Sequence, residues 1–320
     1  MTSKDEDDSP APSDKRKVDE AADLKTEETP QEPAPKKRKA SSSVEDTVKW
    51  LLSDDAFSLA FPALPSGHGE VDWDDTSQHQ RTPPPDDAGK NAEIQDEKEE
   101  SDAEESAKSL LTYPNSPLTP FQNLVAALLL SKPISHRLGL RTINTLLNPP
   151  FGLRTPQDLA EAGFQGRGKV MWEARTQHKE KTAAQLGELV CGVREICGGD
   201  EDVEQMDGLR ERIKNPESVK EAQKRLEKIL TDGIKGIGPT GAGIFMRRVQ
   251  GRWDEVFPYA DQRALDAAVR FGLIEEGDAA RELAAKVDGD RGQFVRLLDV
   301  LVGIHLEKMD EALRKAGVTD

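Results

Sequence analysis

The sequence predicts an all-α protein with a long acidic segment in front of its helices. Signals for helix starts recur along the chain, and apolar residues follow helical spacing, while strand patterns are nearly absent after residue 108. Charge marks the boundary, because residues 1–107 hold 13 Lys and Arg against 29 Asp and Glu, whereas residues 108–320 hold 31 of each. We therefore expect a disordered acidic tail over 1–107 and a helical domain over 108–320.

The acidic segment is rich in Asp, Glu, Pro and Ser, and it has too few branched apolar residues to offset the entropy of ordering it. One island differs from the rest. Residues 44–52 place apolar side chains on one helical face, and further apolar residues follow as far as Leu64 and Trp73. A short helix of this kind could dock on a partner or on the protein's own domain, or could be a chance cluster without a role.

Two basic clusters interrupt the acidic segment. The clusters are Lys15, Arg16 and Lys17, and then Lys36, Lys37, Arg38 and Lys39. The second cluster is flanked by proline and resembles a nuclear import signal, and the pair resembles a bipartite one. We expect a nuclear protein that binds an import receptor, although a lysine cluster in a solvated tail would give the same pattern.

Helix signals after residue 108 fix the order of elements. Thr119 and Thr155 each precede a proline, which is typical of an N-cap followed by proline at the first helical position. The helix over 121–130 is apolar nearly all round and should be buried. A glycine at 163 should end the short helix after Thr155, and Asn215-Pro216 should open another. Later helices are expected over about 261–271, 278–287 and 291–316, giving about eight to ten in all.

The stretch LTDGIKGIGPTGAGIFM, residues 230–246, is the most informative part of the chain. An amphipathic helix ends near Gly233, a tight turn follows, and a helix of small residues begins at Pro239. Glycines at 236 and 238 allow positive φ, and the free amides at the helix start suit a DNA backbone phosphate. A glycine-rich turn between two packed helices would look the same. The residues expected to contact DNA are Lys235, Gly236, Ile237, Gly238, Thr240, Gly241, Arg247 and Arg263.

A second motif follows about twenty residues later, VFPYADQRALDAAVRFGL over 256–273. Together the motifs resemble the helix-hairpin-helix (HhH-GPD) superfamily of DNA glycosylases, which includes endonuclease III and the adenine, 8-oxoguanine and 3-methyladenine glycosylases. That superfamily has a hairpin of the form L-x-G-h-G-x-x-x-A, then a loop, then an aspartate that opens the next helix. The resemblance covers most of 115–305 and implies a two-lobed helical domain.

The resemblance implies that Asp261 is the essential aspartate, which stabilises the cationic sugar left as the base departs. A structural role competes, because Asp is a favoured N-cap, and the two roles coexist since a cap needs one oxygen. Thr240 stands where the bifunctional members have a lysine. A hydroxyl cannot form an imine, so the activity implied is that of the monofunctional glycosylases, with water as nucleophile.

Neither a cofactor nor a metal is expected. Two cysteines cannot build a four-ligand zinc or iron–sulfur site, and the five histidines lack metal-ligand spacing. Where relatives of endonuclease III place a glutamine wedge, residues 131–136 read SKPISH, without an evident plug for the vacated base stack. Trp172, Trp253 and Tyr259 are candidates for a wall on which a base would stack.

The sequence therefore predicts a monomeric base-excision enzyme that binds double-stranded DNA and hydrolyses the N-glycosidic bond of a damaged or mispaired base. Two alternatives stay open. The first is a catalytically inactive DNA-binding or scaffold protein with the glycosylase fold, which Thr240 and Pro133 favour. The second is a partner-binding protein whose acidic tail covers the hairpin. The sequence does not give the damaged base, and no run of about 18 apolar residues points to a membrane.

Overall fold

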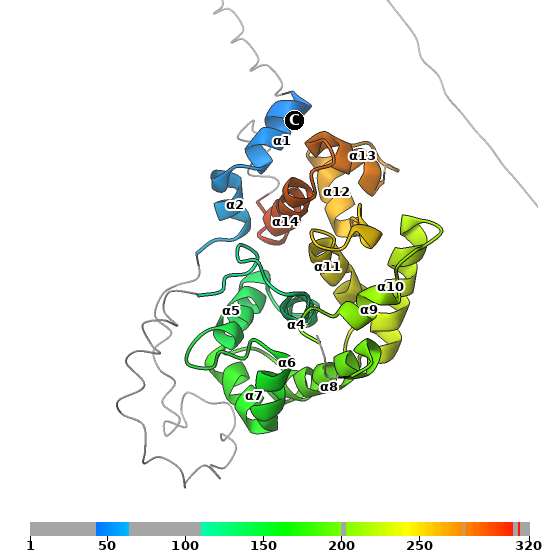
Figure 1. Ribbon diagram of the computed structural model, residues 1–320. Coiled ribbons are helices and arrows are strands. Elements are labelled where there is room, and N and C mark those ends of the chain that lie inside the picture. The colour runs from blue at the N-terminus through cyan, green and yellow to red at the C-terminus, as the bar shows by residue number, and fades with distance from the viewer. Residues whose placement is uncertain (1–42, 64–109, 200–202, 278, 310–312, 314–320) are drawn as a thin grey trace, which may run out of the picture. The chain divides into compact units, whose positions relative to one another are not determined.

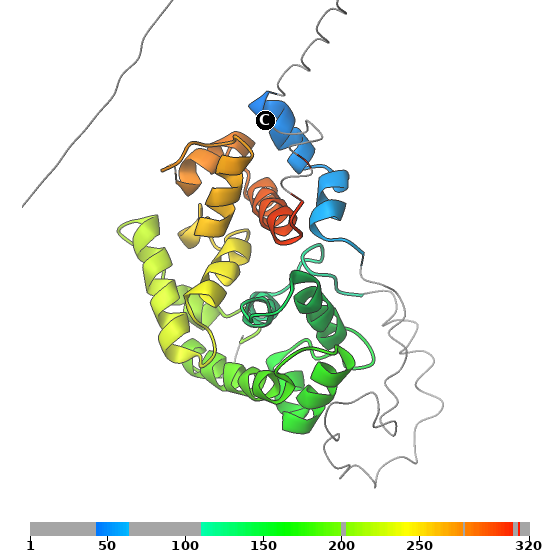
Figure 2. The same cartoon turned by 180° about the vertical axis from the view of Figure 1, so that it is seen from behind.

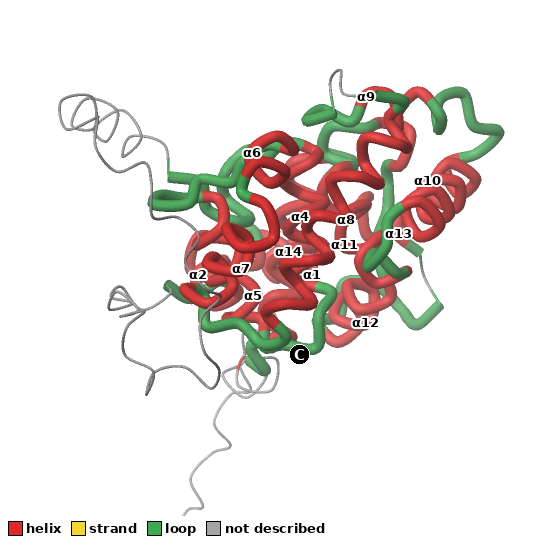
Figure 3. The backbone as a smooth tube through the Cα atoms, turned by 90° about the horizontal axis from the view of Figure 1, so that it is seen from below, coloured by secondary structure: helices red, strands yellow, loops and turns green. Residues whose placement is uncertain are grey.

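The computed structural model describes residues 43–63, 110–199, 203–277, 279–309 and 313. Every regular element among them is a helix (Figures 1 and 3), which confirms the all-α prediction. In chain order the elements are α1 (Val44–Leu51), α2 (Asp54–Ala60), α4 (Pro120–Leu130), α5 (His136–Leu147), α6 (Pro156–Glu161), α7 (Gly163–Glu173), α8 (Lys179–Cys197), α9 (Asp207–Glu211), α10 (Val219–Gly233), α11 (Pro239–Val249), η2 (Asp254–Val256), α12 (Gln262–Arg270), α13 (Ala280–Ala284), η3 (Ala285–Val287) and α14 (Arg291–Leu306). Within this part of the chain, none of the helices combines the length and the apolar character that a membrane crossing requires.

Side-chain caps set most helix starts. Thr119 and Thr155 each accept a hydrogen bond from the amide three residues later and precede the prolines of α4 and α6, as the sequence predicts. The helix expected after Pro216 begins instead at Val219, because Ser218 supplies the cap by accepting from the Glu221 amide. Gly163 does not simply end a helix, since α7 begins at this residue.

Two further boundaries differ from the prediction. The helix expected over 278–287 is a short α-helix, α13, followed by the 3₁₀ turn η3. The last long helix, α14, ends at Leu306 rather than near residue 316.

The buried apolar side chains form two clusters within one compact unit, residues 40–320. The first core is built mainly from α4, α5, α7, α8, α10 and α11. α4 lies at its centre and contacts α5, α8 and α11 (Figure 1). Of the residues of α4 only Leu130 is not fully buried, which confirms the prediction made from its apolar composition.

The second core surrounds α14. This helix lies between α2 on one side and α12 on the other in both views (Figures 1 and 2), and it contacts both. The island in the predicted tail therefore belongs to the helical body, as α1 and α2, so docking on the protein's own domain is confirmed. Leu64, Trp73, both basic clusters and the other residues of the predicted tail lie outside the described residues.

Candidate functional site

The glycine-rich turn joins α10 to α11 as a tight hairpin. Ile234 and Ile237 are buried under the turn, and the Ile237 amide donates to the Ile234 carbonyl at 3.1 Å. Gly236 has φ +99°, a left-handed conformation that favours glycine. Gly238 has φ −107° and ψ −174°, which any residue adopts. The prediction of positive φ is therefore confirmed for Gly236 and wrong for Gly238.

The start of α11 offers free hydrogen-bond donors. The amides of Gly236, Gly238 and Thr240 have no acceptor within the described parts of the chain, and no side chain caps the helix at Gly238. The space there is open, because a Cβ on Gly238 would meet no atom within 4 Å. Free amides and the positive end of a helix dipole make this an anion site in its geometry.

Some of the other hairpin residues are exposed at the surface, and others are buried beneath the turn. Lys235 is exposed and pairs with Glu188 of α8, with 2.5 Å between its Nζ and the Oε1 atom. An exposed ion pair of this kind contributes little, so the ammonium can exchange Glu188 for a phosphate at small cost. Thr240 is exposed, whereas Ile237 and Gly241 are buried and hold the turn in place.

Asp261 caps α12 and joins it to the hairpin helix. Its Oδ1 accepts from the Ala264 amide at 2.9 Å, which confirms the N-cap role. Its Oδ2 accepts from Nη1 of Arg247, on α11, at 2.6 Å. Both carboxylate oxygens are therefore hydrogen-bonded. The side chain is still 20% exposed, so solvent can reach it.

Arg247 is buried, whereas the sequence predicts that it contacts DNA. Its side chain is 6% exposed and reaches two carboxylates, that of Asp261 and that of Asp299, 3.8 Å from Nε. Asp299 also pairs with the half-buried Arg248. Burial alone would lower the pKa of the Arg247 guanidinium, but the negative charges of Asp261 and Asp299 outweigh burial and raise it. The ion pairs explain why α11 turns this arginine inward.

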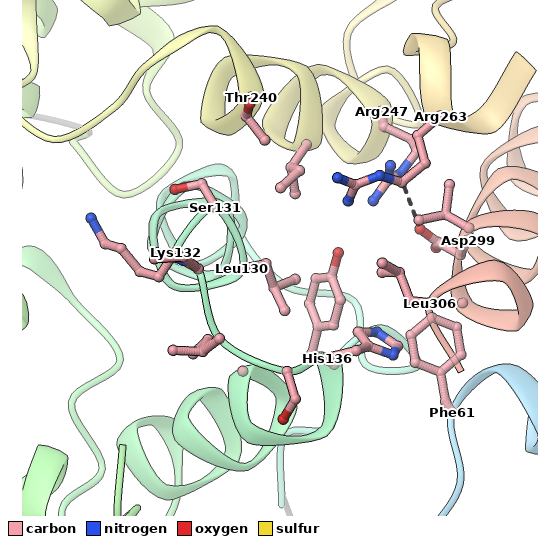
Figure 4. Close-up of a pocket in the computed structure, with 18 residues that line it drawn as sticks. Phe61, Leu130, Ser131, Lys132, His136, Thr240, Arg247, Arg263, Asp299 and Leu306 are labelled. Atoms are coloured by element: carbon pink, nitrogen blue, oxygen red, sulfur yellow. Dashed lines mark ion pairs between the residues drawn. The ribbon is translucent and has the colours of Figure 1, made fainter. Parts of the chain in front are cut away.

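A cavity of about 420 Å³ lies between the two cores, and we call it the α11–α14 cavity (Figure 4). Its size falls within the range of about 300–1,000 Å³ typical of small-molecule sites. Its polar lining is Tyr113, Ser131, Lys132, Ser135, His136, Thr240, Arg247, Arg263 and Asp299. Its apolar lining includes Phe61, Leu130, Ile134, Ile244, Val302 and Leu306.

Asp261 does not line this cavity, but it lies directly behind its wall. Arg247, to which it is bonded, and Arg263, two residues later on α12, both line the cavity. Arg263 is exposed and has no ion-pair partner among the residues that the structure describes. Asp261 therefore contacts a residue that lines the cavity without lining it itself.

The loop between α4 and α5 forms the wall opposite α11. Nζ of Lys132 donates to Oε1 of Gln185 at 2.7 Å, and burial, with Lys181 nearby, lowers the pKa of this lysine. The same Gln185 side chain lies against the hairpin turn, because a Cβ on Gly236 would be 2.7 Å from its Nε2. The Gln185 side chain thus contacts both the loop at 131–136 and the glycine-rich turn between α10 and α11.

Several cavity residues escaped the sequence analysis. Asp299 is the one charged residue within the apolar run 297–304, and that exception is a signal that could have found it. His136 follows Ser135, the N-cap of α5, and its Nδ1 lies 3.2 Å from Glu307 Oε1. Phe61 and Tyr113 come from segments that precede the first long helix, and nothing local predicts their position.

None of the three aromatic residues proposed as a stacking wall lines the α11–α14 cavity. Trp253 is buried in the first core, edge-to-face against Phe245 with 5.7 Å between ring centroids. Trp172 lies under the Lys179 ammonium, 4.3 Å from its ring centroid. Tyr259 borders a separate groove beside α10 and α13. None of the three therefore forms a wall of this cavity.

Within the described ranges, no three His, Cys, Asp or Glu side chains come together as a metal site requires. Comparisons of the chain with protein-family models, with curated proteins and with solved structures found no match.

Proposed function

We propose that this protein is a monofunctional DNA N-glycosylase of the helix-hairpin-helix type, which removes a damaged or mispaired base from double-stranded DNA. The observation that carries the proposal is the place of Asp261, a partly exposed carboxylate directly behind the wall of a ring-sized cavity that the hairpin helix lines. The two cores, with the cavity between them, fit the two lobes of that fold.

In this proposal the α10–α11 hairpin is the part of the protein that binds the DNA backbone. The free amides at Gly238 and Thr240 would hold one backbone phosphate, and Lys235 would add a charge beside it. Such contacts position a duplex without reading its sequence. A base turned out of the stack near this phosphate would meet Thr240 and Arg263 at the entrance of the α11–α14 cavity, because both are exposed and line it.

The chemistry follows from one carboxylate and one water. As the bond between sugar and base breaks, positive charge develops on the sugar, and the partly exposed Asp261 carboxylate beside the cavity wall stabilises it. Water then adds its hydroxyl to the sugar carbon, and its other proton passes through Asp261 to the departing base. Arg247 orients the carboxylate by holding Oδ2, while the Ala264 amide holds Oδ1.

Thr240 accounts for the absence of strand cleavage in this proposal. Thr240 lines the α11–α14 cavity near the start of α11, where a lysine would be able to attack the sugar. A hydroxyl forms no imine with the opened sugar, so the reaction ends at an abasic site.

A second candidate is a DNA-binding or scaffold protein without catalysis. The Arg247 ion pair favours it, because a guanidinium at 2.6 Å offsets part of the negative charge that Asp261 would offer to the sugar. This candidate shares the hairpin contacts and differs only in the chemistry.

Excision assays on a panel of duplexes, each with one damaged or mispaired base, separate the two candidates. We expect wild-type protein to excise at least one base and Asp261→Asn to lower kcat by about 100- to 1,000-fold, as for other groups that stabilise transition-state charge. Asp266→Asn is the matched control, because Asp266 is exposed on the same helix and contacts Gln262. Excision that is the same in Asp261→Asn as in wild type would overturn the catalytic assignment. Binding without excision by wild type would establish the scaffold.

A salt titration tests the hairpin contacts. We expect the logarithm of the binding constant to fall steeply with the logarithm of salt concentration, and Lys235→Ala to reduce that slope by about 1. Lys224→Ala, on the same α10–α11 hairpin but ten residues before the turn, serves as the control. A shallow slope for the wild type would contradict the proposed phosphate contacts.

Nuclear location and an import receptor as partner belong to the same proposal. They rest on the two basic clusters of the sequence, which lie outside the described residues. A fluorescent fusion of the full chain should concentrate in the nucleus, and alanines at Lys36, Lys37, Arg38 and Lys39 should spread it through the cell. Unchanged accumulation would remove the second cluster from the proposal.

A further inference from the structure

One end of the α11–α14 cavity is supplied by the amino-terminal segment, and α14 anchors that segment. Arg296 of α14 donates from Nε to the Leu52 carbonyl at 3.0 Å and pairs with Asp54 at 2.7 Å. Its guanidinium also lies 4.7 Å from the centroid of the Phe57 ring. These contacts hold the junction of α1 and α2 on α14, so the residue that follows α2 has a fixed place.

That residue is Phe61. Its ring lies 5.5 Å from the His136 ring in an edge-to-face arrangement, and it lines the cavity together with Leu306. In Figure 4 Phe61 and His136 lie across the cavity from Arg247 and Arg263. An aromatic ring at one end of a ring-sized cavity offers a flat ligand an apolar surface for stacking.

The cavity also offers hydrogen-bond donors. Tyr113 lines the cavity and is 4% exposed, and its hydroxyl lies near the Arg247 guanidinium without a hydrogen bond of good geometry to any described residue. Burial raises the pKa of this hydroxyl, so it keeps its proton at neutral pH. A buried hydroxyl without a partner is costly, and a ligand oxygen that accepts from it removes that cost.

The charges that line the cavity are mostly positive. Lys132, Arg247 and Arg263 are cations, and Asp299 is the one carboxylate in the lining, already paired with Arg248 and close to Arg247. Burial lowers the pKa of His136 against the opposing effect of Glu307, so this imidazole is neutral at pH 7. A positively charged ring would therefore be repelled, whereas carbonyl oxygens would find donors.

We infer that the α11–α14 cavity takes a planar, uncharged heterocycle that presents a carbonyl oxygen, with Phe61 as its stacking wall and Tyr113 as a donor to that oxygen. This inference rests on the proposed function, since it names the class of base that the glycosylase would remove. Alkylated bases that carry a positive charge are excluded by the same charges. The amino-terminal segment is then part of the site, although α4 begins 59 residues after Phe61.

The test uses three purine nucleosides that differ in the group at C6 and in charge. Inosine is neutral and carries a carbonyl, adenosine is neutral and carries an amine in its place, and 1-methyladenosine is positively charged. Calorimetry with the full chain should give the order of affinity inosine, adenosine, 1-methyladenosine. No binding of inosine, or equal or tighter binding of 1-methyladenosine, would overturn the inference.

Point variants assign the two contacts. Phe61→Ala should weaken inosine binding by about 10-fold or more, the usual scale for loss of a stacking aromatic, and Phe61→Tyr should restore it. Phe164→Ala removes an exposed phenylalanine of α7 that does not line the cavity and should bind as wild type does. If Phe61→Ala and Phe164→Ala bind inosine equally well, Phe61 is not the wall.

Tyr113→Phe tests the donor without loss of packing. Because the hydroxyl makes no hydrogen bond of good geometry to a described residue, this variant should melt no lower than wild type, while its preference for inosine over adenosine should fall by about 5-fold or more. An unchanged preference would overturn this part of the inference.

The same proteins then receive duplexes that contain hypoxanthine or 1-methyladenine, which separates the inference from the proposed function. Nucleoside binding in the expected order without excision of any base would leave the cavity inference in place and overturn the glycosylase. Excision that favours 1-methyladenine over hypoxanthine would keep the glycosylase and overturn the inference.

Discussion

Gly303 of α14 lies against Ala60 of α2 so closely that a Cβ on Gly303 would stand 2.7 Å from the Ala60 Cβ and 2.9 Å from its carbonyl oxygen. Glycine is needed here because two helix backbones meet, and not because of its φ. The absence of a side chain at Gly303 leaves a notch in α14 into which Ala60 of α2 packs. A single methyl group on Gly303 would fill this notch.

Gly303→Ala should lower the free energy of unfolding by about 1–3 kcal/mol, because overpacking outweighs the gain of about 1 kcal/mol from better helix propensity. Gly292→Ala is the matched control in the same helix. It lies in the first turn, exposed, with Asp290 Oδ1 at 3.4 Å as the nearest atom, and should be neutral or stabilising. Urea unfolding measures both, and equal effects would contradict the notch.

The buried carboxylate of Asp299 lies close to two arginines, Arg247 and Arg248, and its negative charge should stabilise the folded protein. Asp299→Asn leaves Arg247 and Arg248 short of one buried carboxylate and should cost about 3–5 kcal/mol. The control is Asp254→Asn, which breaks an ion pair with Arg291 in which the aspartate side chain is 73% exposed, and should cost about 1 kcal/mol or less. Urea unfolding again decides, and similar losses at the two sites would argue against a buried network.

The hairpin glycines should respond differently to the same substitution. Gly236→Ala forces an alanine into φ +99° and against the Gln185 side chain, and should destabilise the protein by about 1–3 kcal/mol. Gly238→Ala should cost about 1 kcal/mol or less, because its backbone is extended and its surroundings are open. Its added methyl group should nevertheless weaken DNA binding, which a titration with duplex DNA would measure. Normal affinity in Gly238→Ala would count against phosphate binding at the turn.

His136 should make the protein less stable in mild acid. Burial lowers the pKa of this imidazole below its usual value of about 6.5, with Glu307 and Asp299 opposing the shift and Arg247 adding to it. The unfolded chain then binds more protons than the folded one below pH 6.5, so the contribution is complete above that pH and is lost as pH falls through the folded pKa.

The measurement is the free energy of unfolding between pH 5 and pH 8. The decline below pH 6.5 should be less steep in His136→Asn than in wild type. His178→Asn, which changes an exposed histidine before α8, should keep the wild-type slope. A slope unchanged by His136→Asn would show that this histidine does not sense acid.

The order and type of the helices could be predicted because their signals are local. The Thr-Pro caps of α4 and α6, the apolar composition of α4 and the aspartate cap of α12 depend on residues a few positions apart, and each is confirmed. The start of α10 was misplaced by three residues, because proline at 216 is a strong signal and the serine cap at 218 is a stronger one.

The cavity could be predicted only in part. Residues Thr240, Arg247 and Arg263 were singled out, and all three line it, but as candidates for contacts with the DNA backbone. Tyr113, His136 and Phe61 reach it from three separate stretches, and no spacing within one stretch encodes such a meeting. The burial of Arg247 was missed because its partners, at 261 and 299, lie 14 and more residues away.

The hydrogen bond from Arg296 to the Leu52 carbonyl joins residues 244 positions apart in the chain. During synthesis α1 and α2 leave the ribosome long before the helix that receives them exists. They can find their place only after nearly all of the remaining helices have been made, and until then their apolar faces stay uncovered. Chaperones would therefore meet α1 and α2 while these helices are still uncovered, and assembly would finish with their docking on α14.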